Sequence, residues 1–183
     1  MNVLSERGVS SSPIFGKFIV EGAARCFAGQ GVDMTVFSPE VQVFVEGAEA
    51  ALGREISIVE AFGFGDSPSM ADELAALVMS GQKTATCGWP ADSALREGTF
   101  NVMQDGRGVP LAVLQSTEVR TLPFLEVEAR FAYDEGEGER TLDWWRGAHR
   151  DFFSRQPEGA RWSDAEVVQC ERFRVVWAPP VIA

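Results

Sequence analysis

Two segments of the chain repeat apolar residues with the period of an α-helix. Residues 38–52 and 67–80 each open with a serine in the N-cap position, Ser38 and Ser67, followed by a proline at the first helical position. Apolar residues then recur every three or four positions, and the second segment stops at Gly81. The sequence therefore predicts two amphipathic helices.

From residue 84 onward the pattern changes to short β-type runs. Residues 99–103 and 110–124 lie on either side of the turn sequence DGRG, which predicts a β-hairpin. A third helix is expected after a Thr141 cap, because apolar residues follow with the spacing of one buried helical face. A closing strand is expected over 167–180, where prolines halt it. Helices before a mostly antiparallel sheet, without βαβ alternation, predict an α+β fold with a small barrel or strongly curved sheet.

Composition fits a globular chain that buries a core without disulfides or a structural metal. The chain has 183 residues, of which 45% are hydrophobic and 23% charged. No apolar run approaches the roughly 20 residues needed to span a bilayer, and Lys17 interrupts the apolar stretch 14–20. We therefore expect a cytoplasmic protein with no membrane partner. Three cysteines without C-x-x-C spacing and a single histidine argue against a disulfide framework or a zinc site.

The charge balance is strongly acidic. Sixteen basic residues stand against 27 acidic ones, for a net charge of -11. Such a field opposes extended binding to a polyphosphate. A local cleft for one nucleotide or nucleoside remains compatible with it, because salt screens charges over about 8 Å.

Lysine is rare in this chain, and Lys83 is placed where chemistry is plausible. Lys17 and Lys83 are the only lysines among the 16 basic residues. A partly buried lysine amine can lose its proton and act as a base or nucleophile, whereas arginine stays charged. Lys83 follows the glycine that ends the second predicted helix, and Thr86 lies three residues on. The two side chains would meet if the chain bends at this helix-to-strand junction.

A second candidate stretch is the acidic segment 132–140. Considered alone, it is typical of a solvated flexible loop. It also holds Tyr133, the only tyrosine, and several carboxylates. A carboxylate from this segment placed against Lys83 would hold the amine, and Thr86 would serve as a hydroxyl nucleophile or water positioner.

Other residues offer weaker candidates. His149 lies on the aromatic face of the third predicted helix and is interpreted as a hydrogen-bonded packing residue. Of the adjacent tryptophans, Trp145 fits the core stripe, so Trp144 is left to cover a cleft or stack on a base. Cys87 lacks a second histidine to activate it as a nucleophile.

Four separated motifs, taken in order, resemble the ASCH-domain family in its YhfF-like branch. They are FGFGDSPSMADELAALVMSGQKTAT, TEVRTLPFLEV, FAYDEGEGERTLDWWRGAHRDFF and CERFRVVW. The resemblance covers about residues 38–177 and implies a PUA-like β-barrel flanked by helices, with a cleft that binds RNA. We therefore expect an N-terminal extension over 1–36, an ASCH domain over 37–178 and a short tail over 179–183.

The resemblance also implies a catalytic set. One branch of the family hydrolyses N4-acetylcytidine with a lysine, a threonine three residues on and a downstream glutamate. The matching positions here are Lys83, Thr86 and Glu137. After Thr86 the chain departs from the family pattern with a shorter stretch that carries Cys87 and a proline, which leaves the substrate contacts open. Substrate contacts are expected from Thr84, Arg120, Tyr133, Glu135, Trp144 and Arg146.

Three functions stay open from the sequence. The first is hydrolysis of an N4-acyl-cytidine-type amide without a cofactor or metal. The second is a ribonuclease on single-stranded RNA, in which the acidic segment holds Mg²⁺ or Mn²⁺. The third is an RNA-binding module without turnover.

Overall fold

The computed structural model describes residues 17–18, 37–92 and 94–180. Residues 17 and 18 are described by their backbone alone. The expected N-terminal extension 1–36 therefore lies almost wholly outside the described residues. No helix in the described part of the chain is both long and apolar enough to cross a bilayer.

Three helices form where the sequence predicts them. Ser38 caps α1 (Pro39–Leu52), Ser67 caps α2 (Pro68–Met79) and Thr141 caps α4 (Leu142–Ser154). In each helix the cap side chain accepts a hydrogen bond from a backbone N–H of the first turn, which satisfies a donor that the helix leaves free. A fourth helix, α3 (Ala129–Glu135), and two 3₁₀ turns, η2 (Phe124–Glu126) and η3 (Gly159–Arg161), were not predicted.

The sheet has the strand order β1-β2-β4-β5-β6-β3. Its strands are β1 (Lys17–Phe18), β2 (Ile58–Phe64), β3 (Ala85–Gly88), β4 (Phe100–Gln104), β5 (Pro110–Pro123) and β6 (Val167–Trp177). The predicted hairpin of β4 and β5 and the closing strand β6 are confirmed, as is the α+β class. Irregular register between β5 and β6, near Val113 and Ser116, accompanies the bend of these long strands.

The expectation of a fold without βαβ alternation is wrong at one place. Strand β2 pairs in parallel with β4, and the connection between them passes through α2 and β3. Six of the seven β2 residues are buried, so the strand shows none of the apolar and polar alternation that marks a half-exposed strand.

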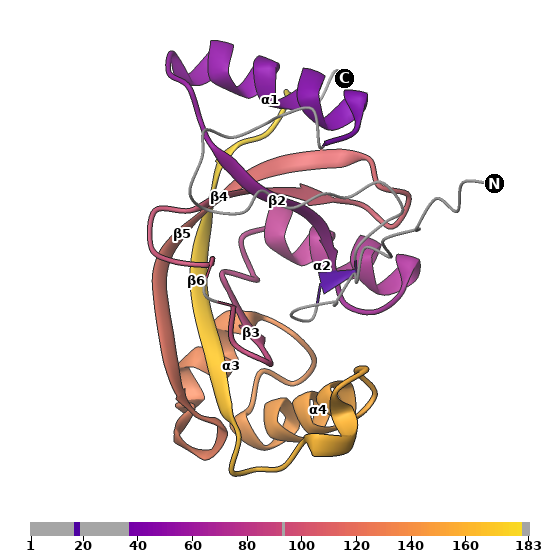
Figure 1. Ribbon diagram of the computed structural model, residues 1–183, viewed down its shortest axis with the longest axis vertical. Coiled ribbons are helices and arrows are strands. Elements are labelled where there is room, and N and C mark those ends of the chain that lie inside the picture. Colours follow the sequence, from indigo (N-terminus) through magenta and orange to yellow (C-terminus); the bar gives the residue numbers. More distant parts are fainter. Residues whose placement is uncertain (1–16, 19–36, 93, 181–183) are drawn as a thin grey trace, which may run out of the picture.

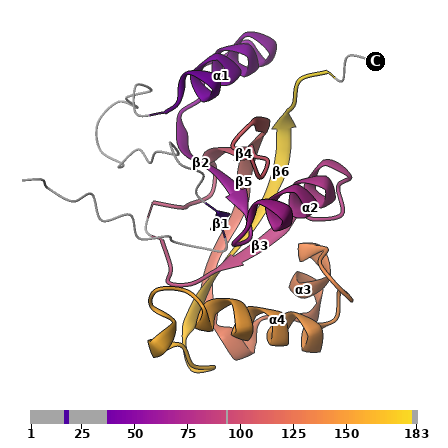
Figure 2. The same ribbon diagram turned by 90° about the vertical axis from the view of Figure 1, so that its right-hand side faces the viewer.

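Figure 1 shows where the helices lie along the two longest strands of the sheet. The strands β5 and β6 run along the molecule, with α1 near one end and α3 and α4 near the other. One apolar core lies under α3 and α4 and is centred on Trp145, Phe124 and Phe153. A second lies under α2 around Phe62 and Phe64. The chain passes from α2 into β3, which lies beside α3 and α4 (Figure 2). The short link between α2 and β3 therefore lies between these two cores.

Candidate active site

Lys83 lies in the short link between α2 and β3 and is only 1% exposed. Its backbone N–H donates to the carbonyl of Leu77, and the N–H of the next residue, Thr84, donates to the carbonyl of Asp134. These bonds hold the link against the C-terminal end of α3. The lysine side chain therefore points into the protein from a fixed backbone.

Two carboxylates hold the buried ammonium group. Lys83 Nζ donates to Glu137 Oε1 at 2.5 Å and to Glu135 Oε2 at 3.4 Å. The amine also lies 5.2 Å from the centre of the Phe64 ring, which provides a weak cation–π contact. Glu135 ends α3 and is buried, whereas the Glu137 side chain, two residues past the helix, is 23% exposed.

The charge state of Lys83 differs from the expected neutral amine. Burial by itself lowers the pKa of Lys83, but Glu137 and Glu135 outweigh burial, so the pKa lies above its ordinary value. Burial likewise opposes ionisation of Glu137, yet the Lys83 ammonium keeps the pKa of Glu137 below its ordinary value. Lys83 is thus a buried cation that holds two carboxylates.

The first half of the acidic segment 132–140 is largely buried helix rather than the solvated loop that its composition suggests, and only residues 136–140 form a loop. Asp134 and Glu135 lie inside α3 and are buried. Asp134 bonds to Arg172 at 2.5 Å and to Arg130 at 3.0 Å; although burial opposes it, these two arginines keep the pKa of Asp134 below its ordinary value. Arg172 comes from β6, a partner too distant in sequence to be predicted from the segment itself.

A cleft of about 260 Å³ lies over this cluster. Four of the expected site residues line it, namely Thr86, Glu135, Glu137 and Trp144. Lys83 itself is not among the lining residues, and its amine bonds to both of the lining carboxylates rather than to Thr86. The Thr86 hydroxyl and the Lys83-held carboxylates therefore border one space, although they come from β3 and from α3 with the segment that follows it.

The other expected contacts lie elsewhere. Thr84 is exposed and its hydroxyl bonds to the carbonyl of Asp134. Tyr133 is 46% exposed, with the Arg140 guanidinium 3.7 Å from its ring centre. Arg120 lines a separate small pocket between β5, β6 and α3, and Arg146 bonds to the carbonyl of Leu125. The structure does not bring these four side chains to the cleft.

Several cleft residues escaped the sequence analysis. Phe64 comes from β2, the strand that was not predicted, and the α2 residues Met70 and Leu74 add an apolar wall. Asp151 and Phe152 come from the last turn of α4 and Arg155 from its C-cap, and Arg155 bonds to Asp66, which lies just before α2, at 3.0 Å. The period of α4 does place Phe152 toward the core side, which was the one available signal.

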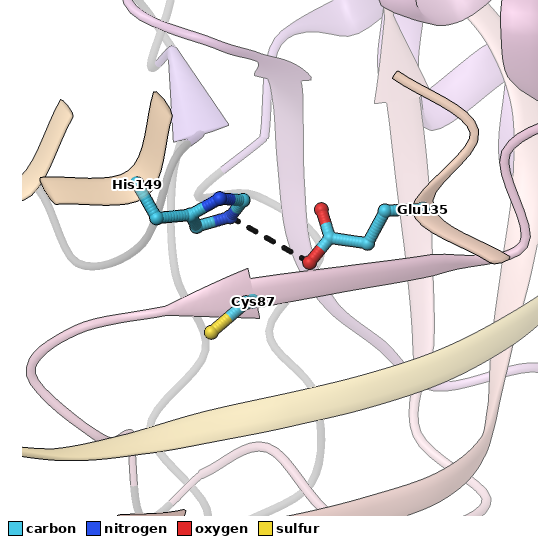
Figure 3. A group of neighbouring side chains, drawn as sticks. All are labelled: Cys87, Glu135 and His149. Carbon is cyan, nitrogen blue, oxygen red and sulfur yellow. Dashed lines mark ion pairs between the residues drawn. The ribbon is translucent and has the colours of Figure 1, made fainter. Parts of the chain in front are cut away.

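Two candidates of lower rank also line the cleft. His149 stacks on Trp145 with 4.1 Å between ring centres, which agrees with its interpretation as a packing residue. Burial and a hydrogen bond with Cys170 raise the pKa of the Cys87 thiol well above its ordinary value, which disfavours a nucleophilic thiolate. Cys87, Glu135 and His149 each offer a ligand atom, all within 4.8 Å of one another (Figure 3).

Gly136 lies between Glu135 and Glu137, the two carboxylates that Lys83 holds, and its surroundings leave no room for a side chain. Its φ is +76°, and a Cβ there would lie 2.5 Å from the carbonyl oxygen of Gln82. Gly81 has φ +77° but no atom within 4 Å of such a Cβ, so it isolates the cost of the backbone conformation. We expect Gly81→Ala to lower the free energy of unfolding by about 1–2 kcal/mol. Gly136→Ala should cost about 1–3 kcal/mol more, because it adds an atomic clash. Equal losses in urea unfolding would contradict this close packing.

Comparisons with known proteins agree with the architecture. The family model of the ASCH domain matches residues 60–177. The chain is 26% identical to the crystal structure of an ASCH domain from Lactobacillus crispatus JV V101, with a TM-score of 0.70 over 82% of this chain and 99% of that one. It is 28% identical to a crystal structure from Enterococcus faecalis V583 described under the family model DUF984, with a TM-score of 0.68 over 79% and 97%. No curated protein matches the chain. With the family model covering well over half of its length, the chain belongs to the ASCH domain family.

Proposed function

We propose that the chain binds an RNA-derived pyrimidine nucleoside in this cleft and hydrolyses an N4-acyl-cytidine-type amide. The observation that carries the proposal is the shared border of Thr86, Glu135 and Glu137 on one cleft, with both carboxylates held by a buried ammonium. A hydroxyl and an oriented carboxylate that border one cleft supply the two groups that nucleophilic acyl transfer needs.

The size and walls of the cleft support a small ligand. A volume of about 260 Å³ lies just below the usual range for small-molecule sites, roughly 300–1,000 Å³, so it suits a small ligand only. Phe64, Trp144 and Phe152 offer aromatic surface for a base. The net charge of -11 also favours an uncharged nucleoside over a polyanion.

We assign the proton transfers to Glu137 rather than to Lys83, because the Lys83 amine already donates to two carboxylates. Thr86 Oγ1 attacks the acyl carbon while its proton passes to Glu137. The tetrahedral intermediate collapses, the bond to N4 breaks, and the leaving amine takes the proton from Glu137. Water then hydrolyses the acyl ester on Thr86, which releases acetate and restores the hydroxyl. Lys83 is already an ammonium and positions both carboxylates.

The metal-dependent ribonuclease is less well supported. Mg²⁺ and Mn²⁺ need several oxygen ligands. Here Glu135 and Glu137 are bound to Lys83, and Asp134 is bound to Arg130 and Arg172. The acidic segment therefore does not present the several free carboxylate oxygens that Mg²⁺ or Mn²⁺ needs, and we derive no step through either ion.

Turnover without metal tests the proposal. The purified protein in EDTA is expected to convert N4-acetylcytidine to cytidine and acetate. Chromatography would measure both products. Single-stranded RNA with and without Mn²⁺ is run in parallel. Cleavage of RNA with Mn²⁺ alone would support the ribonuclease instead. Binding of RNA without any turnover would support a binding module.

Trp144 is the wall residue whose loss should weaken substrate binding most. It is half-buried on α4 and lines the cleft. Stacking of an aromatic side chain on a base contributes about 1–3 kcal/mol, so Trp144→Ala should raise KM by roughly 5- to 150-fold. Tyr133→Ala is the matched control, because Tyr133 stacks on Arg140 outside the cleft, and its KM should stay unchanged. A larger effect at Tyr133 would move the binding site to that surface.

A further inference from the structure

Cys87, Glu135 and His149 form a cluster of three different ligand types on three elements. Cys87 comes from β3, Glu135 from the end of α3 and His149 from the middle of α4, and all three line the cleft. Figure 3 shows the imidazole ring and the carboxylate facing each other, with the thiol beside them. The three residues are at most 9% exposed, so the cluster is buried at the wall of the cleft.

The hydrogen bonds of His149 fix which ring nitrogen can act as a ligand. Nδ1 lies 3.0 Å from the carbonyl oxygen of Trp145, and a carbonyl can only accept, so Nδ1 carries a hydrogen. In the tautomer that carries its hydrogen on Nδ1 alone, Nε2 presents its lone pair to Glu135 Oε1, 3.6 Å away. Two acceptors face each other there, an arrangement that a cation between them stabilises. A backbone carbonyl on the opposite ring nitrogen is also the usual support of a metal-binding histidine.

Glu135 is oriented in the same way. Trp145 Nε1 donates to Oε1 at 2.8 Å, while the Lys83 ammonium holds Oε2. The oxygen that faces His149 is thus the one that Lys83 does not occupy. The local charge also favours a bound cation. Lys83 supplies one positive charge against the two negative charges of Glu135 and Glu137.

The distances suit a small tetrahedral ion. Ligands at about 2.0–2.2 Å from zinc with tetrahedral angles lie about 3.4 Å apart, close to the 3.6 Å between Nε2 and Oε1. A thiolate with a Zn–S bond of about 2.3 Å would lie about 3.6 Å from either ligand. The Cys87 sulfur lies within 4.8 Å of both ligand atoms, so its separation from each would shorten by at most about 1.2 Å. A mixed sulfur, nitrogen and oxygen set favours a thiophilic ion over Mg²⁺.

We propose that Cys87, Glu135 and His149 form a binding site for Zn²⁺ whose fourth position opens into the cleft. Binding replaces the thiol proton of Cys87 by the metal, and the released proton goes to solvent. The inference is independent of the proposed hydrolysis, because it concerns metal binding in the absence of substrate. The zinc site was not expected from the sequence, since no cysteine and histidine share a metal-binding spacing.

Metal titration of the full chain tests the site directly. A Cys26→Ser background leaves Cys87 and Cys170 as the only thiols. Titration with Co²⁺, a spectroscopic substitute for Zn²⁺, should give one equivalent of bound metal and a thiolate-to-metal absorption in the near ultraviolet. Competition by Zn²⁺ should abolish that absorption, and calorimetry in two buffers should register proton release.

Three variants decide whether the named residues hold the metal. Cys87→Ser should remove the thiolate absorption, and His149→Gln should weaken affinity by more than the roughly 10- to 100-fold typical of an outer-shell change. Cys170→Ser should retain both, although Cys170 is the cross-strand neighbour of Cys87. Thermal unfolding in EDTA establishes that each variant is folded, and Glu135→Gln replaces any variant that is not. Absence of thiolate absorption in the parent, or its persistence at full affinity in His149→Gln, would overturn the proposal. Turnover is not measured, so failure here leaves the proposed hydrolysis untouched.

Discussion

Replacing Lys83 by methionine is expected to lower the free energy of unfolding by about 3–5 kcal/mol. Methionine keeps an unbranched side chain of similar length but removes the charge. Glu135, 1% exposed, would then remain as a buried carboxylate without its cation. For a chain of this size the loss corresponds to a fall in Tm of roughly 6–20 °C. Thermal and urea unfolding at neutral pH would measure it.

Two controls separate the buried ion pair from a general loss of charge. Arg150→Met removes an exposed pair with Asp164, whose side chains are 41% and 42% exposed, and should cost at most about 1 kcal/mol. The double variant Lys83→Met with Glu135→Gln should recover part of the loss, because the amide leaves no buried charge. If Lys83→Met were no more destabilising than Arg150→Met, Lys83 would not be the buried cation of this cluster.

Replacing Thr86 by valine is expected to lower kcat/KM for N4-acetylcytidine by about 10³-fold or more, as removal of a nucleophile does in acyl-transfer enzymes. Valine has nearly the shape of threonine and suits a strand, so β3 should keep its pairing with β6. Tm should therefore change little. The loss of activity would then reflect the hydroxyl alone.

Serine and a second threonine supply the controls. Thr86→Ser keeps a hydroxyl and should retain measurable turnover. Thr84→Val removes the hydroxyl of an exposed threonine outside the cleft and should leave kcat/KM unchanged. A Thr86→Val protein with full activity would exclude Thr86 as the nucleophile, and the attacking group would have to be water.

Local chemistry explains which elements the sequence predicts well. Ser38, Ser67 and Thr141 act within one helical turn, so their caps are readable without knowledge of the fold. Strand β2 was missed because burial on both faces removes the alternation on which strand prediction depends. Helix α3 was missed because its acidic residues resemble a solvated loop until Arg172 and Lys83 neutralise them.

In the candidate site, too, the sequence predicts what local patterns encode and misses what tertiary contacts create. The rarity of lysine identified Lys83, the position three residues on identified Thr86, and the family resemblance identified Glu137. The central partnership of Lys83 with Glu135 joins residues 52 positions apart, and no local pattern encodes it. Its consequence, an ammonium in place of a neutral base, depends on that tertiary contact. The same holds for Cys87 and His149, which only the packing of β3 against α4 brings together.

Acetate release from N4-acetylcytidine by the wild-type chain and by Thr86→Val, both in EDTA, tests the central claim most directly. The account predicts steady production of equal amounts of acetate and cytidine by the wild type. It predicts a rate at least about 10³-fold lower for the folded variant. No acetate from the wild type, or equal rates from both proteins, would contradict hydrolysis by the Thr86 hydroxyl in this cleft.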